Sequence, residues 1–351
     1  MRVGIVGAGK ISAQYSDTLL AYPELPVTAV ADLDPARASA LADRHPGARV
    51  LDLADLCASP DVDVVLNLTT PAGHAPVALQ AIKSGKHVYG EKPLAPAMDE
   101  ARSMLTAADE AGVRLACAPD TVLGAGIQTA LAVLDSGVIG APHAATAFMT
   151  TPGHERWHPD PEFYYQPGGG PVLDMGPYYL TTLVHLLGPI RRVSGVSVRP
   201  HPTRTIGSGP KAGAGFPVTI DTHTTGYLEH AGGAVTTVLF SFDTWAARLP
   251  HIEVYGADGS LSVPDPNRFD GDVEIFTRSS PEWAKVSWNA GYNPGGRGTG
   301  LVDLASAVET GTPHRTGADV ALHVLEVMLA LTSGEVTELT TTCTVPDRAP
   351  S

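Results

Sequence analysis

A glycine-rich turn at the start of the chain has the residue types that bind a dinucleotide. A short apolar run over residues 2–6 ends in Gly7-Ala8-Gly9, and apolar residues at helical spacing follow. The first glycine of such a turn permits a tight bend, the second lets the backbone approach a pyrophosphate, and the helix N-terminus offers N–H donors. Ser12 replaces the third glycine, whose role is helix–strand packing, so a small residue suffices. The predicted pyrophosphate contacts are Gly7, Gly9, Lys10 and Ile11.

Asp32 stands at the distance that this kind of turn requires of an acidic residue. It follows the second predicted strand, residues 27–31, and comes 20 residues after Ser12. A carboxylate there accepts hydrogen bonds from the adenosine ribose hydroxyls and repels a 2′-phosphate. We therefore expect NAD as the cofactor, with NADP still open. The alternative is a structural glycine turn in which Asp32 is an ordinary surface acid.

Three further segments resemble a known family. Residues 69–74 read Thr-Thr-Pro-Ala-Gly-His, residues 85–94 read Gly-Lys-His-Val-Tyr-Gly-Glu-Lys-Pro-Leu, and residues 168–178 read Gly-Gly-Gly-Pro-Val-Leu-Asp-Met-Gly-Pro-Tyr. Together they resemble the glucose–fructose oxidoreductase and inositol dehydrogenase family (Gfo/Idh/MocA). In that family a Thr-Pro turn and a nearby histidine end the fourth strand, Glu-Lys-Pro ends the fifth, and a GGGxxxDxGxH segment follows.

This resemblance covers nearly the whole chain and implies an NAD(P)-dependent oxidoreductase. Its substrate would be a secondary alcohol or ketone of a sugar, cyclitol or related polyol, bound between two domains at the nicotinamide end of the cofactor. The resemblance also implies homodimers or homotetramers that form through the open face of an antiparallel sheet. Carried onto this sequence, the further cofactor contacts are Thr70, Pro71, His74, Glu91 and Lys92.

Two departures from the family pattern affect the expected chemistry. Ala72 follows the Thr-Pro turn where the family commonly has Asn, and it cannot make the contact of an Asn side chain. Tyr178 and Thr181 stand where a frequent family pattern has His and Asp. Family members with Tyr at the first of these places use Lys and Tyr as their acid and base. The resemblance therefore implies a tyrosine mechanism here.

The chemistry of these residue types supports the Lys/Tyr pair. Oxidising a secondary alcohol requires a hydride acceptor and a base for the hydroxyl proton. Free tyrosine has a pKa of about 10, but an ammonium group within about 4–6 Å lowers it. We expect Tyr178 to exchange the proton, Lys92 to lower its pKa and hold the substrate oxygen, and Asp174 to orient substrate hydroxyls. The alternatives are a surface Lys92, a packed Tyr178 without a proton role, and Asp174 as a helix cap.

An aromatic loop at residues 154–165 precedes the glycine triplet and is a candidate substrate wall. Trp157 and His158 are its best candidates, because aromatic faces and polar donors suit a hydroxyl-rich ring. The loop is equally suited to a contact between domains or subunits. His185 shares a helix face with Tyr178 but is expected to serve packing. Arg297, in a glycine-rich loop, is a weaker candidate to reach the site.

The first 120 residues have the pattern of a sheet that would gather these groups. Apolar runs alternate with helical segments, and the runs cover residues 2–6, 27–31, 48–51, 62–68, 87–89 and 113–118. Alternating strands and helices predict an α/β fold with a parallel, doubly wound sheet that binds ligands at the carboxyl ends of its strands. We therefore expect a dinucleotide-binding Rossmann domain over residues 1–120.

After residue 120 the pattern becomes α+β. Helices are predicted at residues 127–136, 177–187, 300–310 and 318–331, and period-2 strands at 193–199, 222–229, 234–242, 251–255 and 273–276. They predict a large, mostly antiparallel open sheet in a substrate-binding and oligomerisation domain over residues 121–351. Residues 200–217 are rich in Pro and Gly and are expected to form a mobile connection.

Composition limits the other classes of function. The 351 residues suit two domains, and a net charge of −14 argues against nucleic acid and anionic membrane partners. Three cysteines without a CxxC motif support neither a disulfide framework nor a zinc site, so no metal is expected. The chain shows no run of 18 apolar residues and no cleavable leader, so we expect a cytoplasmic protein with a small-molecule substrate.

Two other functions on the same fold stay open. An NAD-dependent glycoside-cleaving enzyme would oxidise its sugar transiently, eliminate the aglycone and reduce the sugar again. A non-catalytic dinucleotide-binding regulator would have lost its acid and base. Glu91, Lys92 and Tyr178 are all present in this chain, which favours the enzyme.

Overall fold

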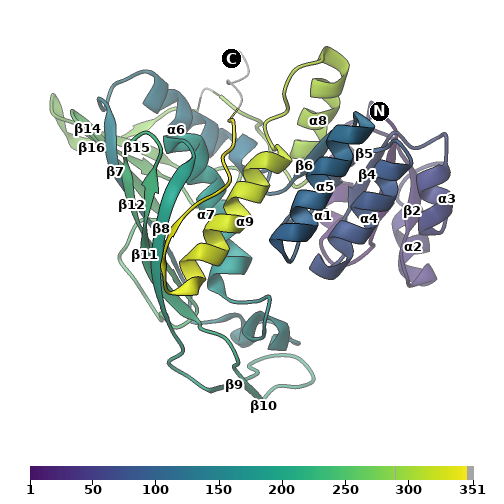
Figure 1. Cartoon of the computed structure of the whole chain (residues 1–351), viewed down its shortest axis with the longest axis horizontal. Coiled ribbons are helices and arrows are strands. Elements are labelled where there is room, and N and C mark those ends of the chain that lie inside the picture. Colours follow the sequence, from purple (N-terminus) through teal and green to yellow (C-terminus); the bar gives the residue numbers. More distant parts are fainter. Residues whose placement is uncertain (289, 346–351) are drawn as a thin grey trace. The chain divides into compact units, whose positions relative to one another are not determined.

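The computed structural model describes residues 1–288 and 290–345, which divide into two compact units; most of their helices and strands are labelled in Figure 1. The first unit combines Met1–Gly124 with Tyr292–Leu322, and the second combines Ala125–Gly291 with His323–Thr344. The predicted boundary at residue 120 places residues 292–322 in the second domain, whereas in the structure they pack with the first unit. The division between the units falls within helix α9, Ala318–Ser333.

The first unit contains six strands. They are β1 (Val3–Val6), β2 (Val27–Ala31), β3 (Arg49–Val50), β4 (Val64–Asn67), β5 (His87–Gly90) and β6 (Leu115–Cys117). All neighbouring pairs are parallel, and the strand order is β3-β2-β1-β4-β5-β6. The predicted doubly wound parallel sheet is therefore confirmed. The order reverses between β1 and β4, and sheets of this kind bind ligands at the carboxyl ends of the strands at such a point.

Helices link these strands, and their ends follow the usual capping chemistry. They are α1 (Ser12–Leu19), α2 (Pro35–Ala42), α3 (Leu53–Ala58), α4 (Pro71–Lys83) and α5 (Met98–Ala111), with a 3₁₀ turn η1 at Thr121–Leu123. The Asp34 carboxylate accepts the N–H of Ala36 at the start of α2, and Asp52 accepts the N–H of Asp55 at the start of α3. Gly112 ends α5 with a φ of 66°, which a glycine adopts without strain.

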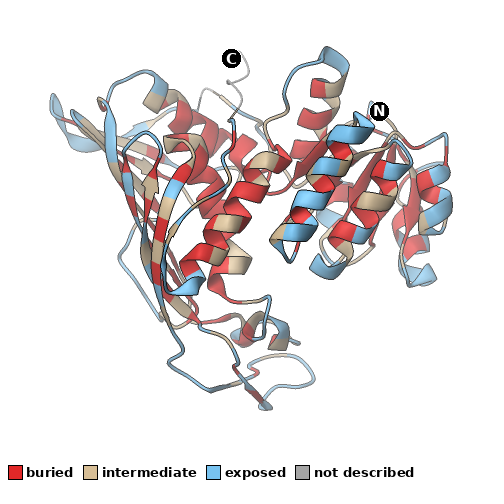
Figure 2. Ribbon diagram, viewed as in Figure 1, coloured by how far each residue is buried: buried red, intermediate tan, exposed pale blue. Residues whose placement is uncertain are grey.

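Helix α8 (Thr299–Thr310) returns to the first unit and completes its core. Leu301 and Leu304 are fully buried in one cluster with Tyr15 and Tyr89. Gly300 lies so close to this cluster that a Cβ on it would be 2.4 Å from the Tyr89 hydroxyl oxygen. Figure 2 shows the strands of the sheet as largely buried. The first unit therefore needs residues from the far end of the chain to close its core.

The second unit is built on a nine-stranded sheet. Its strands are β7 (Pro142–Thr150), β8 (Ile190–Val198), β11 (His223–His230), β12 (Val235–Ser241), β13 (Ile252–Gly256), β14 (Gly259–Val263), β15 (Val273–Thr277), β16 (Ser280–Val286) and β17 (Val336–Glu338). The order is β16-β15-β14-β13-β7-β12-β11-β8-β17. β7 pairs with β12 in parallel and the other neighbours are antiparallel, so the predicted large, mostly antiparallel sheet is confirmed.

Helices α6 (Ala125–Asp135) and α7 (Pro171–Leu187) of the second unit pack near this sheet. The part of α9 in this unit lies against β8, where a Cβ on Gly195 would be 2.1 Å from the Leu331 carbonyl oxygen. Helix α7 contacts β7, β11 and β12. Side chains alternate along these strands, so Val238 and Phe240 are buried while Val196 and Tyr227 are exposed. Helix α7 begins six residues earlier than predicted, because Pro171 suits a first helical position, where an N–H has no helical partner.

The segment predicted as a mobile connection, residues 200–217, contains two paired strands. They are β9 (Thr203–Thr205) and β10 (Gly215–Pro217). Arg204 on β9 is buried, and its guanidinium pairs with Glu155 at 2.7 Å and with Asp243. It also donates to the backbone carbonyl of Phe242 at 3.0 Å. This arginine anchors β9 to the rest of the second unit.

A membrane-spanning helix, a metal site and a disulfide each have structural requirements that the described residues do not meet. No helix among them has the length and apolar character needed to cross a membrane. Within the same residues, no group of three or more His, Cys, Asp or Glu side chains is arranged to hold a metal ion. Cys57, Cys117 and Cys343 are buried free thiols.

Candidate functional site

The turn after β1 has one glycine that is tightly packed and one that is open. Gly7 has a φ of +100°, and a Cβ on it would lie 2.7 Å from the carbonyl atoms of Leu68. Around Gly9, none of the described atoms lies within 4 Å of the place of a Cβ. Ser12 donates its hydroxyl to the Gly9 carbonyl at 2.7 Å where α1 begins. Gly7 thus allows the tight bend of the turn. The open space beside Gly9 lets a pyrophosphate approach the backbone, as such a site requires.

Asp32 follows β2 and lies beside this turn. Its Oδ2 accepts the N–H of Ala8 at 2.6 Å, and its Oδ1 accepts the N–H of Asp34 at 2.8 Å. A carboxylate has about four acceptor sites, so one held in this way is still able to receive ribose hydroxyls. Lys10 is exposed next to the turn, and Ile11 is the residue that caps α1. These residues fit the pyrophosphate and adenosine ribose of NAD.

Glu91 and Lys92 follow β5 at the same edge of the sheet. Glu91 Oε1 accepts the Tyr15 hydroxyl at 2.7 Å, and Oε2 accepts the backbone N–H of Lys92 at 3.0 Å. Burial and the neighbouring Glu91 charge raise the pKa of Tyr15 well above its usual value, so its phenol stays protonated and donates. Tyr15 is absent from the predicted site, because its buried place on α1 is typical of a packing residue. The contacts hold the Glu91 carboxylate and the Lys92 backbone in place.

His74 joins the ends of β4 and β5. Its Nδ1 lies 2.6 Å from the Pro93 carbonyl oxygen, and its Nε2 lies 3.1 Å from that of Thr69. Burial lowers the pKa of His74 although both carbonyls act to raise it, so the ring is neutral and donates through one nitrogen. The shorter distance indicates Nδ1. Thr70 and Pro71 begin α4 next to this ring. Through these contacts His74 orders the loop after Lys92. A contact between His74 and the nicotinamide stays a prediction.

In the second unit, Asp174 and Tyr178 lie one turn apart on α7. They are four positions apart, so their side chains share a face of the helix. Asp174 lies within the first turn, and its N–H donates to the Gly170 carbonyl at 3.0 Å. Gly170 holds the N-cap position and Asp174 lies inside the helix, so Asp174 is not the N-cap residue of α7. Tyr178 is buried, with 8% of its surface exposed.

The Asp174 carboxylate has a histidine partner that the sequence analysis does not select. A 3₁₀ turn, η2 (His154–Arg156), places His154 Nε2 3.0 Å from Asp174 Oδ2. The two residues are 20 positions apart and lie in different elements, so no helix or strand period relates them. His154 lies in the loop predicted to contact substrate, where aromatic character and hydrogen-bonding capacity favoured Trp157 and His158.

Trp157 and His158 follow η2 directly and belong to an aromatic cluster. The Trp157 ring is 53% exposed and packs edge-on against His154 and His158, with ring centroids 5.3 and 5.4 Å apart. The His158 ring also packs against Phe163 and Tyr164 of η3 (Glu162–Tyr165). The loop therefore presents aromatic rings next to the Asp174–His154 contact. Direct substrate contact by Trp157 and His158 stays a prediction.

Arg297 and His185 are the two weaker candidates. The Arg297 side chain belongs to the first unit, is 12% exposed and lies 3.8 Å from the buried Asp120 carboxylate. Burial raises the pKa of that carboxyl, and the Arg297 charge acts to lower it. His185 lies in the last turn of α7, almost two helical turns beyond Tyr178, and is partly buried.

Two cavities in the described residues are not lined by the predicted catalytic or cofactor-binding residues. One of about 660 Å³ in the first unit is lined by Asp63 and His87, which stand at the amino ends of β4 and β5. It therefore lies at the opposite edge of the sheet from Gly7 and Lys92. One of about 280 Å³ in the second unit is lined by the glycine triplet but not by Asp174 or Tyr178.

Taken together, the glycine turn, the ribose carboxylate and the doubly wound sheet define an NAD-binding Rossmann unit, joined to a unit with a large open sheet. The sequence matches the same two parts. Residues 1–118 match the oxidoreductase family with an NAD-binding Rossmann fold, and residues 127–262 match the GFO/IDH/MocA C-terminal domain. The chain belongs to the Gfo/Idh/MocA oxidoreductase family.

Curated relatives include enzymes of sugar metabolism. The chain is 33% identical over 234 residues to a dTDP-3,4-didehydro-2,6-dideoxy-alpha-D-glucose 3-reductase of Streptomyces violaceoruber, covering 66% of this chain and 68% of that one. It is 29% identical over 265 residues to a 1,5-anhydro-D-fructose reductase of Ensifer adhaerens, covering 74% of each. For six other curated relatives the match spans between 33% and 64% of the relative's length.

Solved structures share the fold over almost the whole chain. A levoglucosan dehydrogenase in complex with NADH and L-sorbose superposes with a TM-score of 0.82 at 20% identity, covering 97% of this chain and 99% of that one. An NAD-binding oxidoreductase from Klebsiella pneumoniae superposes with a TM-score of 0.79 at 22% identity, covering 97% and 99%. At these identities the likeness concerns the fold.

Proposed function

We propose that this protein transfers a hydride between NAD and a secondary alcohol or ketone of a sugar, cyclitol or related polyol. The observation that carries the proposal lies at the carboxyl edge of the parallel sheet. There the open glycine turn, the anchored Asp32 and the Glu91–Lys92 pair follow three strands of one sheet. The names of the curated relatives support a carbohydrate-like substrate.

The proposed reaction uses three side chains. When bound, NAD supplies the hydride acceptor, or the donor in its reduced form. Tyr178 takes the hydroxyl proton during oxidation and returns it during reduction. Lys92 favours the phenolate by its charge and holds the substrate oxygen. Asp174 accepts hydrogen bonds from neighbouring hydroxyls and sets the orientation of the ring.

Asp32 is the proposed source of cofactor preference. Its carboxylate is held at the turn by two backbone N–H groups and accepts the ribose hydroxyls of NAD. The negative charge repels the 2′-phosphate of NADP. We therefore expect a higher kcat/KM with NAD than with NADP.

The test is NADH formation across a panel of hexoses, pentoses, anhydrosugars and inositols, with NADH oxidation by the matching ketones. Lys92→Met and Tyr178→Phe are each expected to lower kcat by roughly 10²-fold or more, because proton transfer by a positioned group contributes that much. Lys83→Met and Tyr227→Phe are matched controls, since both side chains are exposed. Both controls should keep wild-type turnover.

The outcomes separate the candidate functions. Turnover of one ring class that is lost in both variants supports the proposal. Near-normal turnover of Tyr178→Phe contradicts the tyrosine role and leaves Lys92 as the base. Tight NAD binding without any turnover contradicts the oxidoreductase, and bond cleavage of a glycoside without net NADH indicates the cleaving enzyme.

A further inference from the structure

The contact between His154 and Asp174 is a partly buried pair within the second unit. Nε2 of the imidazole lies 3.0 Å from Oδ2 of the carboxylate, and the side chains are only 13% and 19% exposed. At this distance the imidazole N–H donates to the carboxylate. Asp174 is the residue proposed to orient the substrate, so whatever fixes its carboxylate also fixes that orientation.

The imidazole ring itself has little freedom. It packs against the rings of Phe242, Tyr164 and Trp157, with centroids 4.5, 4.6 and 5.3 Å away. Its second nitrogen, Nδ1, is buried and has no hydrogen-bond partner in the described part of the chain. The packing therefore holds the ring in one orientation, with Nε2 directed at Asp174.

The backbone that presents His154 is anchored by buried charges. Its N–H donates to the Tyr165 hydroxyl at 3.0 Å, and that hydroxyl donates to the Glu155 carboxylate. Glu155 pairs with the buried guanidinium of Arg204 at 2.7 Å. Gly153 precedes the turn with a φ of +112°, and a Cβ there would lie within 2.7 Å of side-chain atoms of all three anchoring residues. The turn therefore has one conformation, and it sets His154 against α7.

We propose that His154 is the positioning residue of Asp174: it holds the carboxylate in the orientation that accepts a substrate hydroxyl. This inference rests on the proposed function and identifies a residue outside the predicted site. A carboxylate accepts up to about four hydrogen bonds, so binding the imidazole is compatible with binding a hydroxyl. A residue that orients an active group in this way typically changes its performance 10–100-fold.

The buried Nδ1 distinguishes this role from simple packing. An unpartnered buried polar atom lowers stability, and an apolar side chain of similar size would fill the same aromatic pocket without that cost. Packing alone therefore does not require a histidine here. We expect His154→Leu to melt within a few degrees of the wild type while losing substrate affinity.

One test needs no substrate. An imidazole N–H that donates to a carboxylate and is shielded from water gives a strongly downfield proton resonance, visible in protein labelled with ¹⁵N-histidine. The resonance of His154 is expected in the wild type, absent in His154→Leu and shifted upfield in Asp174→Asn. His158→Leu is the control and should retain it. If no resonance depends on both His154 and Asp174, the pairing is contradicted.

The second test is a double-mutant cycle on the substrate that the panel identifies. His154→Leu is expected to raise KM roughly tenfold with kcat within about threefold. His154→Gln, which keeps an N–H donor near the place of Nε2, should restore most of the affinity. In the Asp174→Asn background the same His154→Leu change should add less than about twofold, because its effect passes through Asp174.

An equal loss in both backgrounds overturns the proposal and leaves His154 a residue of the loop only. The two failures are distinguishable. A wild-type protein that turns over no polyol but shows the paired resonance contradicts the proposed function while confirming the pairing. An active wild type in which His154→Leu has unchanged KM contradicts the positioning role alone.

Discussion

Carboxylates of the candidate sites accept hydrogen bonds from residues distant in sequence. The amide of Ala8 reaches Asp32 across 24 positions, the hydroxyl of Tyr15 reaches Glu91 across 76, and His154 reaches Asp174 across 20. A carboxylate held in this way loses less freedom when a ligand binds, which favours binding. At the residue scale, the candidate binding carboxylates are therefore held in place by other residues of the chain before any ligand binds.

The residues that hold these carboxylates are the part of the candidate site that is hardest to predict from the sequence alone. Gly7, Asp32 and Lys92 are predictable because each acts from a strand end, and strand ends are visible as short apolar runs. The direction of His154 is not, because it depends on Arg204 holding Glu155 from 49 positions away. A long-range ion pair of this kind has no local pattern in the sequence.

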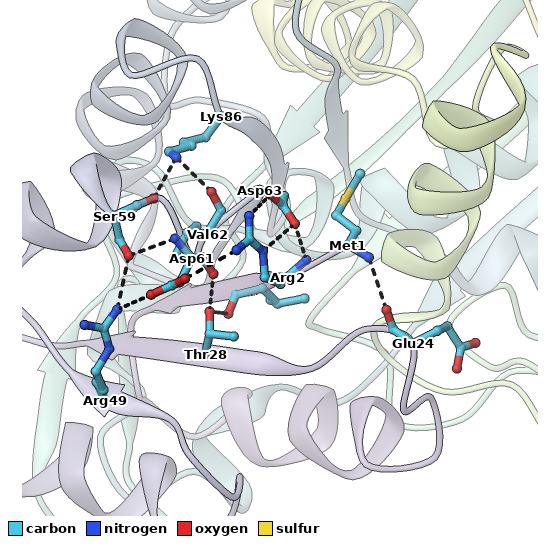
Figure 3. Close-up of polar contacts among 11 residues, drawn as sticks. Met1, Arg2, Glu24, Thr28, Arg49, Ser59, Asp61, Val62, Asp63 and Lys86 are labelled. Atoms are coloured by element: carbon cyan, nitrogen blue, oxygen red, sulfur yellow. Dashed lines mark hydrogen bonds and ion pairs between the residues drawn. The ribbon is translucent and has the colours of Figure 1, made fainter.

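The Asp63–Arg2 pair gives the first unit a pH-dependent contribution to stability, and Figure 3 shows it among its neighbours. Hydrogen bonds from Arg2 lower the pKa of Asp63 to about 2. Because the folded pKa is depressed, the contribution is fully present above the unfolded value of about 3.9 and is lost as pH falls towards 2. Both side chains are more than a third exposed, so solvent screening limits the effect to about 0.5–1 kcal/mol.

Urea unfolding of the wild type and Asp63→Asn measures this contribution at pH 7, 5, 4 and 3. The difference should be constant from pH 7 to 5 and should shrink at pH 4 and 3. Asp109→Asn changes an exposed acid and serves as the control. A difference that stays the same at every pH would mean that the ionised pair contributes nothing.

At the scale of elements, the sequence predicts a strand made of large apolar residues more readily than a strand whose buried positions are small residues. Strand β4 reads as a continuous apolar run and was predicted, because a strand covered on both faces has that pattern. Strand β7 was missed, because Pro, His, Ala and Thr dominate it and its buried positions are mostly alanine. The start of α7 was placed too late, because the Gly-Gly-Gly-Pro segment is typical of a loop.

The turn between β1 and α1 gives a prediction that separates folding from binding. Gly7→Ala introduces a Cβ at 2.7 Å from the Leu68 carbonyl and a strained φ, so the first unit should lose stability by several kcal/mol. Gly9→Val places its side chain in open space, so the melting temperature should change little. The same side chain should block a pyrophosphate and weaken NAD binding by roughly tenfold or more.

Thermal unfolding and titration calorimetry with NAD test the two variants side by side. Gly47→Ala is a control for strain alone, since Gly47 has a φ of +85° but no described atom near the place of a Cβ. If Gly9→Val binds NAD as tightly as the wild type, the dinucleotide site lies elsewhere.

At the scale of the whole molecule, the first unit is assembled from both ends of the sequence. The predicted dinucleotide domain ends at residue 120, since the alternation of strands and helices stops there. The structure adds Tyr292–Leu322, and Leu301 and Leu304 complete its core. Helix α8 returns to this unit after the 167 residues Ala125–Gly291. The sequence shows that it is a helix, but packing decides which unit it joins.

Asp120 holds this returning segment to the first unit. It is fully buried, and its Oδ2 accepts the N–H groups of Gly298 at 2.7 Å and Gly300 at 3.2 Å, at the start of α8. Burial raises the pKa of Asp120, although Arg297 and the two N–H groups act to lower it. Asp120→Ala leaves both donors buried and unpaired, which should lower the unfolding free energy by roughly 2–4 kcal/mol.

The part of the Asp120→Ala protein that loses stability is as informative as the size of the loss in unfolding free energy. Hydrogen exchange should accelerate in α8 and in its neighbours β5 and β6, while β11 and β12 of the second unit keep their wild-type rates. Asp109→Ala, at an exposed position, should change stability by less than about 0.5 kcal/mol. Equal acceleration in both units would show that the returning helix is not a separable part of the first unit. Confined acceleration would show that one buried carboxylate, 178 positions from its nearer partner, closes the dinucleotide-binding unit.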